Sequence, residues 1–288
     1  YQISSSSLAS SFCQYLQQYF IDSNLAPLLN EVELPTPEQQ KQNIIALKAL
    51  LKKSAYHMHF EGHHKKSSVV ANPVSILPLI GYGRRKNKLN GVIRKVIKGS
   101  RQQLLILTPY FNLPPVLARD IVNALKRGVE ITLVVGDKTA NDFYIADQAT
   151  FSTIGIVPYI YAMLLKRFVK RNQAFIDKGL LNIHLWQDQD NSFHLKGIIS
   201  DERYHLLTGS NLNPRAWALD LENGLLLDDA SQGLMTKVTP EIKAIMTHTQ
   251  KITHYSELDA VSDYPEKPKK LLNKIRFAQI DRILKRFL

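Results

Sequence analysis

The sequence predicts an α/β protein in which helices flank a mixed β-sheet. From about residue 76 onward, short apolar runs typical of buried strands alternate with segments whose apolar residues recur at helical spacing. Such alternation is typical of helices packed on a sheet. Hydrophobic residues make up 44% of the 288-residue chain, which is enough for a packed core. No apolar run reaches the roughly 18 residues that a membrane span requires.

The first 75 residues read as the end of a strand followed by two helices. The strand end is expected at residues 1–3, and residues 7–21 are expected to be helical after possible N-caps at Ser5 to Ser7. Residues 38–53 form a second amphipathic pattern. Between the two helices, a connector is marked by Pro27, Pro35 and Pro37. Residues 54–75 have few periodic apolar side chains and are expected to be irregular.

The rest of the chain alternates. Strands are expected at residues 104–109, 131–135, 181–186, 194–200, 203–207 and 224–227, and helices at residues 114–126, 159–176 and 214–218. Pro114 suits the first turn of its helix, and Gly128 suits the position just beyond the end of that helix. Residues 241–288 are expected to be mostly helical.

The charge balance favours an anionic partner. Lys and Arg number 37 against 25 Asp and Glu, a net charge of +12, which suits nucleic acid, a membrane surface or a phosphorylated substrate. Aromatic residues mostly share apolar faces instead of interleaving with basic stripes, which argues against nucleic acid. The single cysteine, Cys13, excludes a disulfide framework and suits a reducing compartment. Four histidines lack acidic or cysteine partners at ligand spacing, so no metal site is expected at His57, His59, His63 and His64.

The most specific local feature is the run from His194 to Asp201, which has the pattern HxKxxxxD. On a strand, His194 and Lys196 would point to the same face, because side chains alternate. Lys196 can hold a phosphate oxygen as a point charge, and an imidazole can act as a nucleophile or carry a proton at neutral pH. Asp201 could orient the imidazole. The alternative is three polar residues on an exposed hairpin.

The residues that follow strengthen the functional interpretation. Residues 208–215, Thr-Gly-Ser-Asn-Leu-Asn-Pro-Arg, form a small-residue turn into a helix, and Glu222 begins another apolar strand. Together with the HxKxxxxD run they resemble the second HKD motif of the phospholipase D superfamily. The resemblance implies a phospholipase D-like sandwich, substrate contact by Ser210, and support of the catalytic histidine by Glu222. The catalytic residues that it implies are His194, Lys196, Asp201, Asn211, Asn213 and Glu222.

Three further stretches narrow the resemblance. Residues 108–114, 136–144 and 211–217 are similar to the Gram-negative bacterial CDP-diacylglycerol–serine O-phosphatidyltransferases, the phosphatidylserine synthases. This implies transfer of a phosphatidyl group from CDP-diacylglycerol to L-serine with release of CMP, through a covalent phosphohistidine-type intermediate and without a cofactor. It also implies a cytoplasmic enzyme held peripherally at the cytoplasmic face of the inner membrane. Three alternatives stay open: a cardiolipin synthase, a nuclease of the same superfamily, and a non-catalytic lipid-binding scaffold.

The superfamily builds one active site from two HKD motifs, and this sequence holds one. His63 and His64 are the other histidines placed two residues before a lysine, and neither has an acid seven residues later. We therefore expect the first motif to lie upstream of Tyr1, and the first-motif histidine is the usual nucleophile in the superfamily. That leaves His194 as general acid and base. The alternative is a single-motif protein that dimerises.

This reading divides the chain into three parts. Residues 1–75 are expected to be the end of a first phospholipase D-like half with a connector. Residues 76–240 are expected to be the second half, and residues 241–288 a basic helical tail that packs on the core and on the membrane.

Two further groups of residues are expected to bind substrate or lipid. Lys138, Asn141 and Asp142 follow a predicted strand, where α/β proteins place ligands, so they are expected to contact CDP or the serine ammonium. The alternative is a well-capped loop. The tail combines apolar residues with cations in the pattern of a helix that docks on anionic lipid. The expected membrane-binding residues are Lys269, Lys270, Lys274, Arg276, Arg282, Lys285 and Arg286.

Overall fold

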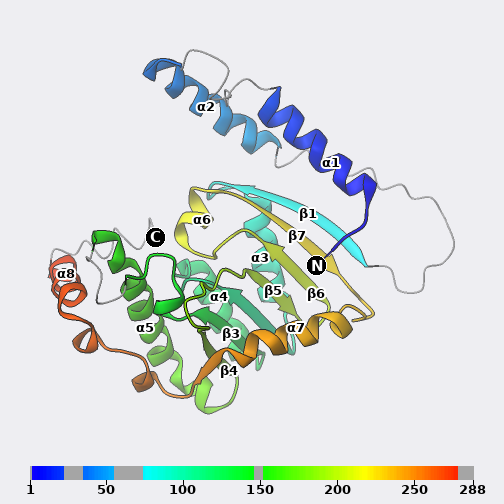
Figure 1. The fold of residues 1–288 in the computed structure, drawn as a ribbon. Helices are drawn as coiled ribbons and strands as arrows, with labels where there is room; N and C mark the ends of the chain where they lie inside the picture. Colours follow the sequence, from blue (N-terminus) through cyan, green and yellow to red (C-terminus); the bar gives the residue numbers. More distant parts are fainter. Residues whose placement is uncertain (1, 23–34, 55–73, 146–151, 278–288) are drawn as a thin grey trace.

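The computed structural model describes residues 2–22, 35–54, 74–145 and 152–277 (Figure 1). At its centre is an eight-stranded sheet with the order β1-β7-β6-β5-β2-β3-β4-β8, in which β2, β3 and β4 are parallel and the other neighbours antiparallel. The strands are β1 (Ser75–Tyr82), β2 (Gln103–Thr108), β3 (Glu130–Gly136), β4 (Leu181–Trp186), β5 (Gly197–Ser200), β6 (Tyr204–Thr208), β7 (Leu221–Asp228) and β8 (Thr249–Ile252). The predicted mixed sheet with flanking helices is confirmed.

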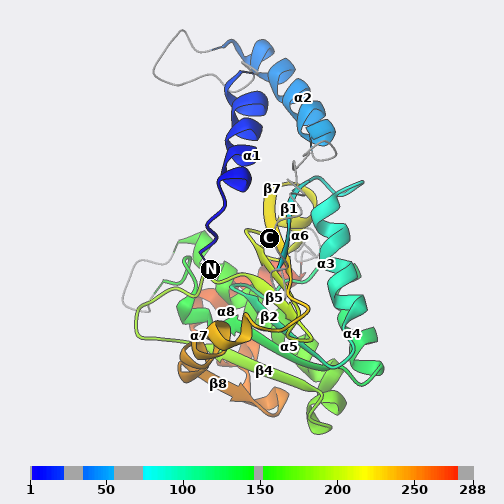
Figure 2. The ribbon, with the colours of Figure 1, turned by 90° about the vertical axis from the view of Figure 1, so that its right-hand side faces the viewer.

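Helices cover both faces of this sheet (Figure 2). One face is covered by α3 (Lys88–Gly99), α4 (Pro115–Lys126) and α5 (Val157–Asp177), and the other by α7 (Met235–Thr247). The alternation of β2 explains the two layers. Ile106 lies in the same core cluster as Ile93 of α3 and Leu117 of α4. Leu107 points the other way and packs on the cluster that also contacts Ile245 of α7. Each fully buried aliphatic side chain of this kind stabilises the fold by roughly 1.5–3 kcal/mol.

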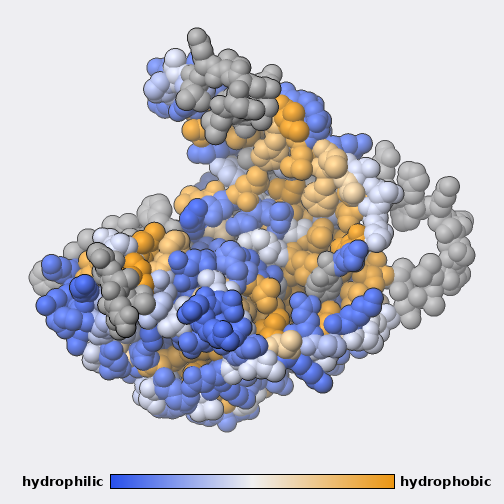
Figure 3. All heavy atoms as spheres, viewed as in Figure 1, coloured by the Kyte–Doolittle hydropathy of each residue, from blue (hydrophilic) through white to orange (hydrophobic). Residues whose placement is uncertain are grey.

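The N-terminal helices project beyond the sheet (Figures 1 and 2). They are α1 (Ser6–Leu16), which continues as a π-helix (Gln17–Ile21), and α2 (Pro37–Ser54). Ser5 caps α1, and Tyr15 is buried. Several other apolar side chains of this pair are exposed, namely Leu16, Ile21, Ile44 and Ile45. Figure 3 shows apolar side chains gathered below the N-terminal helices, over the part of the sheet formed by β1 and β7.

The strand expected at residues 1–3 is not present at residues 2 and 3. The described sheet ends at β1, whose partner is β7, so no strand runs beside these residues to pair with them. The four histidines between residues 57 and 64 lie outside the described residues.

The tail departs from the prediction of mostly helix, because it contributes a strand to the sheet. β8 pairs with β4 in antiparallel register, and Ile252 is buried. The boundary expected at residue 240 falls inside α7. Two short 3-10 turns, η4 (Tyr255–Glu257) and η5 (Val261–Asp263), then lead to α8 (Glu266–Phe277). Across the described ranges, no helix is both long and apolar enough to cross a membrane.

Candidate active site

His194 and Lys196 lie in the loop that enters β5, not on the strand itself, which begins at Gly197. The predicted proximity of the two side chains is nevertheless present. Lys196 Nζ lies 3.0 Å from His194 Nδ1 and donates to the backbone carbonyl of His194 at 2.9 Å. The loop therefore places an ammonium beside an imidazole whose side chain is 57% exposed.

Asp142 approaches the other side of the same imidazole. Its Oδ2 atom lies 3.5 Å from His194 Nε2 and accepts a hydrogen bond of 2.6 Å from the hydroxyl of Tyr110. The hydrogen bond from Tyr110, followed by one from Ser192 and by the charges of His194 and Lys196, outweighs partial burial and holds the pKa of Asp142 below its usual value. Asp142 is thus an ionised carboxylate that can fix the orientation of His194.

The sheet order explains why these distant residues meet. β5 runs antiparallel to β2, with Gly197 opposite Leu107, and β2 runs parallel to β3, with Thr108 opposite Val135. The start of β5 therefore meets the carboxyl ends of β2 and β3 at one edge. Ligands of open α/β sheets bind at the carboxyl ends of strands, so this edge suits a reaction site.

An aromatic pair forms one wall of the site. Tyr110 stacks on Tyr161 of α5, with ring centroids 5.2 Å apart and an interplanar angle of 12°, and presents its edge to His194 at 6.2 Å. Burial and the hydrogen bond to Asp142 raise the pKa of Tyr110, and burial raises the pKa of Tyr161 to about 12. Both hydroxyls therefore stay protonated at neutral pH and can act as hydrogen-bond donors.

Glu222 lies at the start of β7, and its carboxyl group interacts electrostatically with Lys196. Burial, and then the neighbouring charge of Asp220, raise the pKa of Glu222 to about 7, although Lys196 and Arg215 act to lower it. Burial lowers the pKa of Lys196, while Asp142 and Glu222 oppose that shift. Lys196 thus lies in the field of two carboxylates, one of which takes up or releases a proton near neutral pH.

Gly209 makes room for Glu222. A Cβ at position 209 would lie 2.9 Å from Oε2 of Glu222, which is closer than real contacts allow. A side chain at position 209 would therefore require the Glu222 carboxylate to move from its place in the site.

We expect the Glu222→Gln variant to gain stability relative to the parent as the pH rises from about 5 to about 8. Because the folded-state pKa of Glu222 lies above its ordinary value of 4.5, the folded protein retains a proton there that the unfolded chain has released. The stability that this proton gives the folded parent is complete below pH 4.5 and is lost as the pH rises through about 7. Glutamine has no charge to desolvate. The Tm of the variant minus the Tm of the parent should therefore be larger at about pH 8 than at about pH 5. An equal difference at the two pH values would contradict the pKa assigned to Glu222.

Asp201 lies away from the imidazole, contrary to expectation. It follows β5 at the end opposite to His194, and an extended segment of that length spans roughly 20 Å. Its carboxylate accepts hydrogen bonds of 2.8–3.2 Å from the backbone N–H groups of Arg101, Gln102 and Gln103. The aspartate therefore fixes the turn after β5 to the start of β2, and it does not orient the histidine.

The turn after β6 supports the site through the side-chain amide of Asn213, and not through the hydroxyl of Ser210. Ser210 is 1% exposed, and its Oγ accepts a hydrogen bond from the N–H of Leu212, so the expected contact of this hydroxyl with substrate is not available. Asn213 caps α6 (Pro214–Ala218) by accepting from the N–H of Ala216, and its side chain also hydrogen-bonds Tyr161. It thus positions the aromatic wall.

Asn211 carries an unused acceptor. Its Oδ1 atom is buried and has no hydrogen-bond donor among the described residues. A buried acceptor without a donor costs about 1–3 kcal/mol.

Of the three polar residues expected on the 138–142 loop, only Asp142 contacts His194. Lys138 forms an ion pair with Asp259, and Asn141 uses its Oδ1 to accept from the N–H of Phe143. Asn141 is therefore the local loop cap that the alternative interpretation predicted, and Lys138 faces a different opening.

The basic residues expected to bind lipid are partly described. Lys269 donates to the carbonyl of Ser262, Lys270 pairs with Glu266 at 3.0 Å, and α8 buries Leu272 against the cluster around Tyr264. The apolar side of α8 thus packs on the protein. The side chain of Arg276 and all of Arg282, Lys285 and Arg286 lie outside the described residues.

Sequence reasoning missed the roles of Tyr110, Tyr161, Ser192 and Asp259. Tyr110 lies in a stretch that the resemblance covers, but no spacing connects it with Asp142. Only the order of strands in the sheet brings Tyr110 and Asp142 together.

Comparison with known proteins gives a consistent picture. Residues 93–246 match the family model described as "Cardiolipin synthase, PLD-like domain". The chain is 38% identical over 275 residues to CDP-diacylglycerol–serine O-phosphatidyltransferase PssA of Escherichia coli K12, covering 96% of this chain and 59% of that protein. It is 38% identical over 288 residues to the CDP-diacylglycerol–serine O-phosphatidyltransferase of Haemophilus influenzae, covering 100% of this chain and 62% of that protein. The crystal structure of the Haemophilus influenzae phosphatidylserine synthase has a TM-score of 0.89 and 39% identity, covering 99% of this chain and 63% of that chain.

These matches agree on the region that holds the site. The chain spans about three fifths of the length of the curated relatives that it matches. The segment matched by the family model contains the loop of His194 and Lys196, the loop of Asp142, and Glu222. With more than half of its residues in that match, the chain belongs to the family of phospholipase D-like domains.

Proposed function

We propose that this chain forms part of an enzyme that transfers a phosphatidyl group from CDP-diacylglycerol to L-serine, releasing CMP. The observation that carries the proposal is the 38% identity, along almost the whole chain, to two proteins named for that reaction. The cluster of His194, Lys196, Asp142 and Glu222 supports it, because phosphoryl transfer needs a proton carrier and cationic stabilisation at one point.

His194 carries the proton in both steps of the proposed reaction. In the first step the histidine of the other HKD motif attacks phosphorus, a P–N bond forms, and the P–O bond to CMP breaks as His194 gives its proton to the departing oxygen. In the second step His194 takes the proton of the serine hydroxyl. The serine oxygen then attacks phosphorus and the P–N bond breaks. Dividing one difficult displacement into two in this way is the usual gain from covalent catalysis.

The neighbours of His194 have distinct tasks in this scheme. Lys196 balances the negative charge on the five-coordinate transition state. Asp142 holds the imidazole from the Nε2 side, and the Tyr110 hydroxyl holds Asp142. Glu222 adjusts the charge around Lys196, because its carboxyl changes protonation near neutral pH.

We propose that the protein reaches its lipid substrate by binding the cytoplasmic face of an anionic membrane. Lys274 and its basic neighbours on α8 support this, and each cation at such a surface contributes about 1 kcal/mol. Because the apolar side of α8 packs against the Tyr264 cluster, the proposed contact is electrostatic, without helix insertion. Vesicle binding should therefore weaken steeply as salt is raised.

An acceptor assay tests the proposed function. The protein as the cell makes it is incubated with vesicles containing CDP-diacylglycerol and with L-serine, phosphatidylglycerol, water alone or DNA. We expect CMP release coupled to phosphatidylserine formation with L-serine. Cardiolipin formation with phosphatidylglycerol would favour a cardiolipin synthase, and DNA cleavage would favour a nuclease. Lipid binding without turnover of any of these would leave the non-catalytic scaffold.

A further inference from the structure

A second opening lies beside the catalytic cluster, on the α5 side of the same sheet edge. It is a cavity of about 180 Å³ at the carboxyl ends of β2, β3 and β4. One water occupies about 30 Å³, and pockets for drug-sized ligands begin near roughly 300 Å³, so this cavity suits a ligand of few atoms. The residues of its wall that matter most are Lys138, Asn141, Tyr161, Leu165, Leu258 and Asp259.

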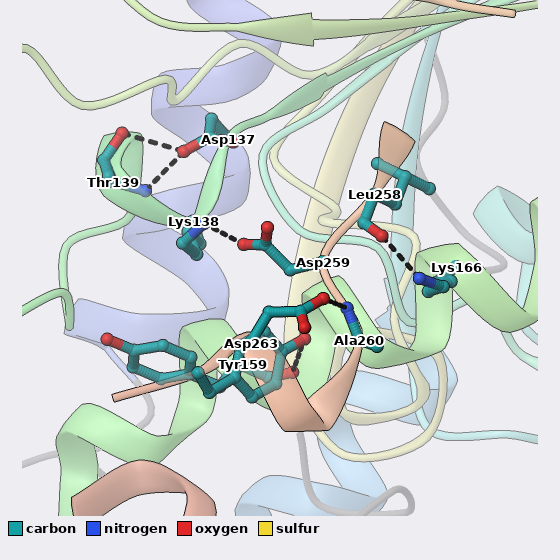
Figure 4. Close-up of polar contacts among 10 residues, drawn as sticks. Asp137, Lys138, Thr139, Tyr159, Lys166, Leu258, Asp259, Ala260 and Asp263 are labelled. Atoms are coloured by element: carbon teal, nitrogen blue, oxygen red, sulfur yellow. Dashed lines mark hydrogen bonds and ion pairs between the residues drawn. The ribbon is translucent and has the colours of Figure 1, made fainter. Parts of the chain in front are cut away.

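One cation and one anion face each other in this cavity. Lys138 and Asp259 both line it, point toward one another and form a direct ion pair (Figure 4). Their side chains are 26% and 39% exposed, so both charges are partly removed from water yet reachable by a ligand. Apolar side chains, Leu165 and Leu258 among them, line much of the rest of the wall. Two further carboxylates also belong to it, but both are engaged elsewhere: Asp137 accepts from the N–H of Thr139, and Glu257 accepts from backbone N–H groups of residues 253 and 254.

Both charged residues are held by their surroundings. Asp137 accepts hydrogen bonds from the N–H and the hydroxyl of Thr139, which fixes the turn that carries Lys138. The segment that carries Asp259 is fixed on both sides. Lys166 of α5 donates to the carbonyl of Leu258, and the N–H of Ala260 donates to Asp263 at 2.7 Å (Figure 4). These hydrogen bonds therefore hold the segments that carry Lys138 and Asp259 in place before a ligand binds.

Charge balance selects the class of ligand. A ligand with a single charge would pair with either Lys138 or Asp259 and leave the other without its partner, which is costly for a partly buried charge. A zwitterion has no such cost, because its carboxylate pairs with Lys138 and its ammonium with Asp259, so two ion pairs replace one. A volume of about 180 Å³ accommodates a zwitterion of the size of a small α-amino acid.

The cavity also adjoins the reaction site. Tyr161 lines it and stacks on Tyr110, which contacts His194, and Asn141 lines it next to Asp142. Lys138 follows β3 and His194 precedes β5, with β2 between them, so the two lie about two strand spacings apart, roughly 10 Å. A small amino acid at Lys138 and Asp259 therefore lies at the same sheet edge as the catalytic histidine.

We propose that this cavity binds the α-amino-acid acceptor of the phosphatidyl transfer, with its carboxylate on Lys138 and its ammonium on Asp259. The assignment of the ligand as the acceptor rests on the proposed function.

Calorimetry of L-serine binding, without CDP-diacylglycerol, tests the cavity independently of turnover. We expect Asp259→Asn and Lys138→Gln each to weaken binding by about tenfold or more, because each removes one charge-assisted contact. In the transfer assay, the same variants should raise the KM for L-serine by a similar factor and leave the KM for CDP-diacylglycerol within about twofold. Glu266→Gln makes a carboxylate-to-amide change, like Asp259→Asn, on the exposed surface of α8. This control should change neither L-serine binding nor the KM for L-serine.

A charge exchange separates phosphatidyl transfer from stability. Combining Lys138→Asp with Asp259→Lys restores an ion pair, so it should recover the Tm that a single variant loses. L-serine can pair with the exchanged charges only in the reversed orientation, with its ammonium at position 138 and its carboxylate at position 259, so phosphatidyl transfer should stay well below that of the parent. Unchanged L-serine binding in both single variants would overturn the proposal, as would a rise confined to the KM for CDP-diacylglycerol. If L-serine binds and the single variants weaken it, but no phosphatidyl transfer occurs, the cavity stands and the proposed function fails.

Discussion

The His194→Ala variant is expected to lose phosphatidyl transfer by about 10³-fold or more while keeping its fold. A positioned proton carrier contributes about 10²–10⁴-fold to a rate, and in the proposed scheme His194 acts in both steps. Its side chain is 57% exposed and lies in a loop, so removing it opens no cavity in the core. CMP release and phosphatidylserine formation, measured at saturating substrates alongside the Tm, check both parts of the expectation.

Asp201→Asn is the matched control from the same motif. Asp201 holds three backbone N–H groups of residues 101–103 and lies far from the imidazole. Weakening these charge-assisted hydrogen bonds should lower the free energy of unfolding by about 1.5–3 kcal/mol. Turnover well below the lowered Tm should remain near that of the parent. Parent-like activity in His194→Ala would remove His194 from the proposed mechanism.

The Asp142→Asn variant is expected to lower kcat by about 10–100-fold, the usual loss when a supporting group behind a reactive side chain is removed. Asparagine fills the same space but lacks the charge that faces His194 Nε2. Because this support acts on proton transfer more than on lipid binding, the KM for CDP-diacylglycerol should change little. Steady-state kinetics that separate kcat from KM provide the measurement.

Tyr110→Phe provides a graded comparison. It keeps the ring that stacks on Tyr161 and removes only the hydroxyl that donates to Asp142 at 2.6 Å. One hydrogen bond to a charged group contributes about 1.5–3 kcal/mol, so the loss in kcat should be at least about tenfold, and no larger than that of Asp142→Asn. The double variant should lose no more than Asp142→Asn alone, because both act on one contact. Fully multiplicative losses would show that the two residues act separately.

The sequence predicted the parts of the site that depend on local spacing. His194 and Lys196 are two residues apart, and an extended chain brings their side chains together whether or not a ladder forms. The loop nonetheless stays out of the sheet, since β5 begins at Gly197. Short apolar runs also located most strands, among them β2, β3 and β4, because much of each run is buried in the sheet.

Contacts set by the order of strands were beyond the reach of that reasoning. Asp142 lies 3.5 Å from His194 because β2 and β3 end where β5 begins, and nothing in the spacing of residues 142 and 194 indicates this. Asp201 was assigned to the histidine by its place in the motif, whereas its carboxylate serves the start of β2. The short strand β8 was missed because, with Ile252 as its buried side chain, it gives too weak a periodic signal.

The position of β8 has a consequence for how the protein is made. β4 pairs with β3 on one side and with β8 on the other, and some sixty residues of chain separate β4 from β8. During translation the outer edge of β4 therefore stays open until residue 252 has left the ribosome, and the packing of Leu258 and Leu272 comes later still. An open strand edge is a site of aggregation. Nascent chains that stop within α7 should thus need chaperones to prevent aggregation. Once residue 272 has left the ribosome, β8 can cover the edge of β4 and the packing around Leu258 and Leu272 can form.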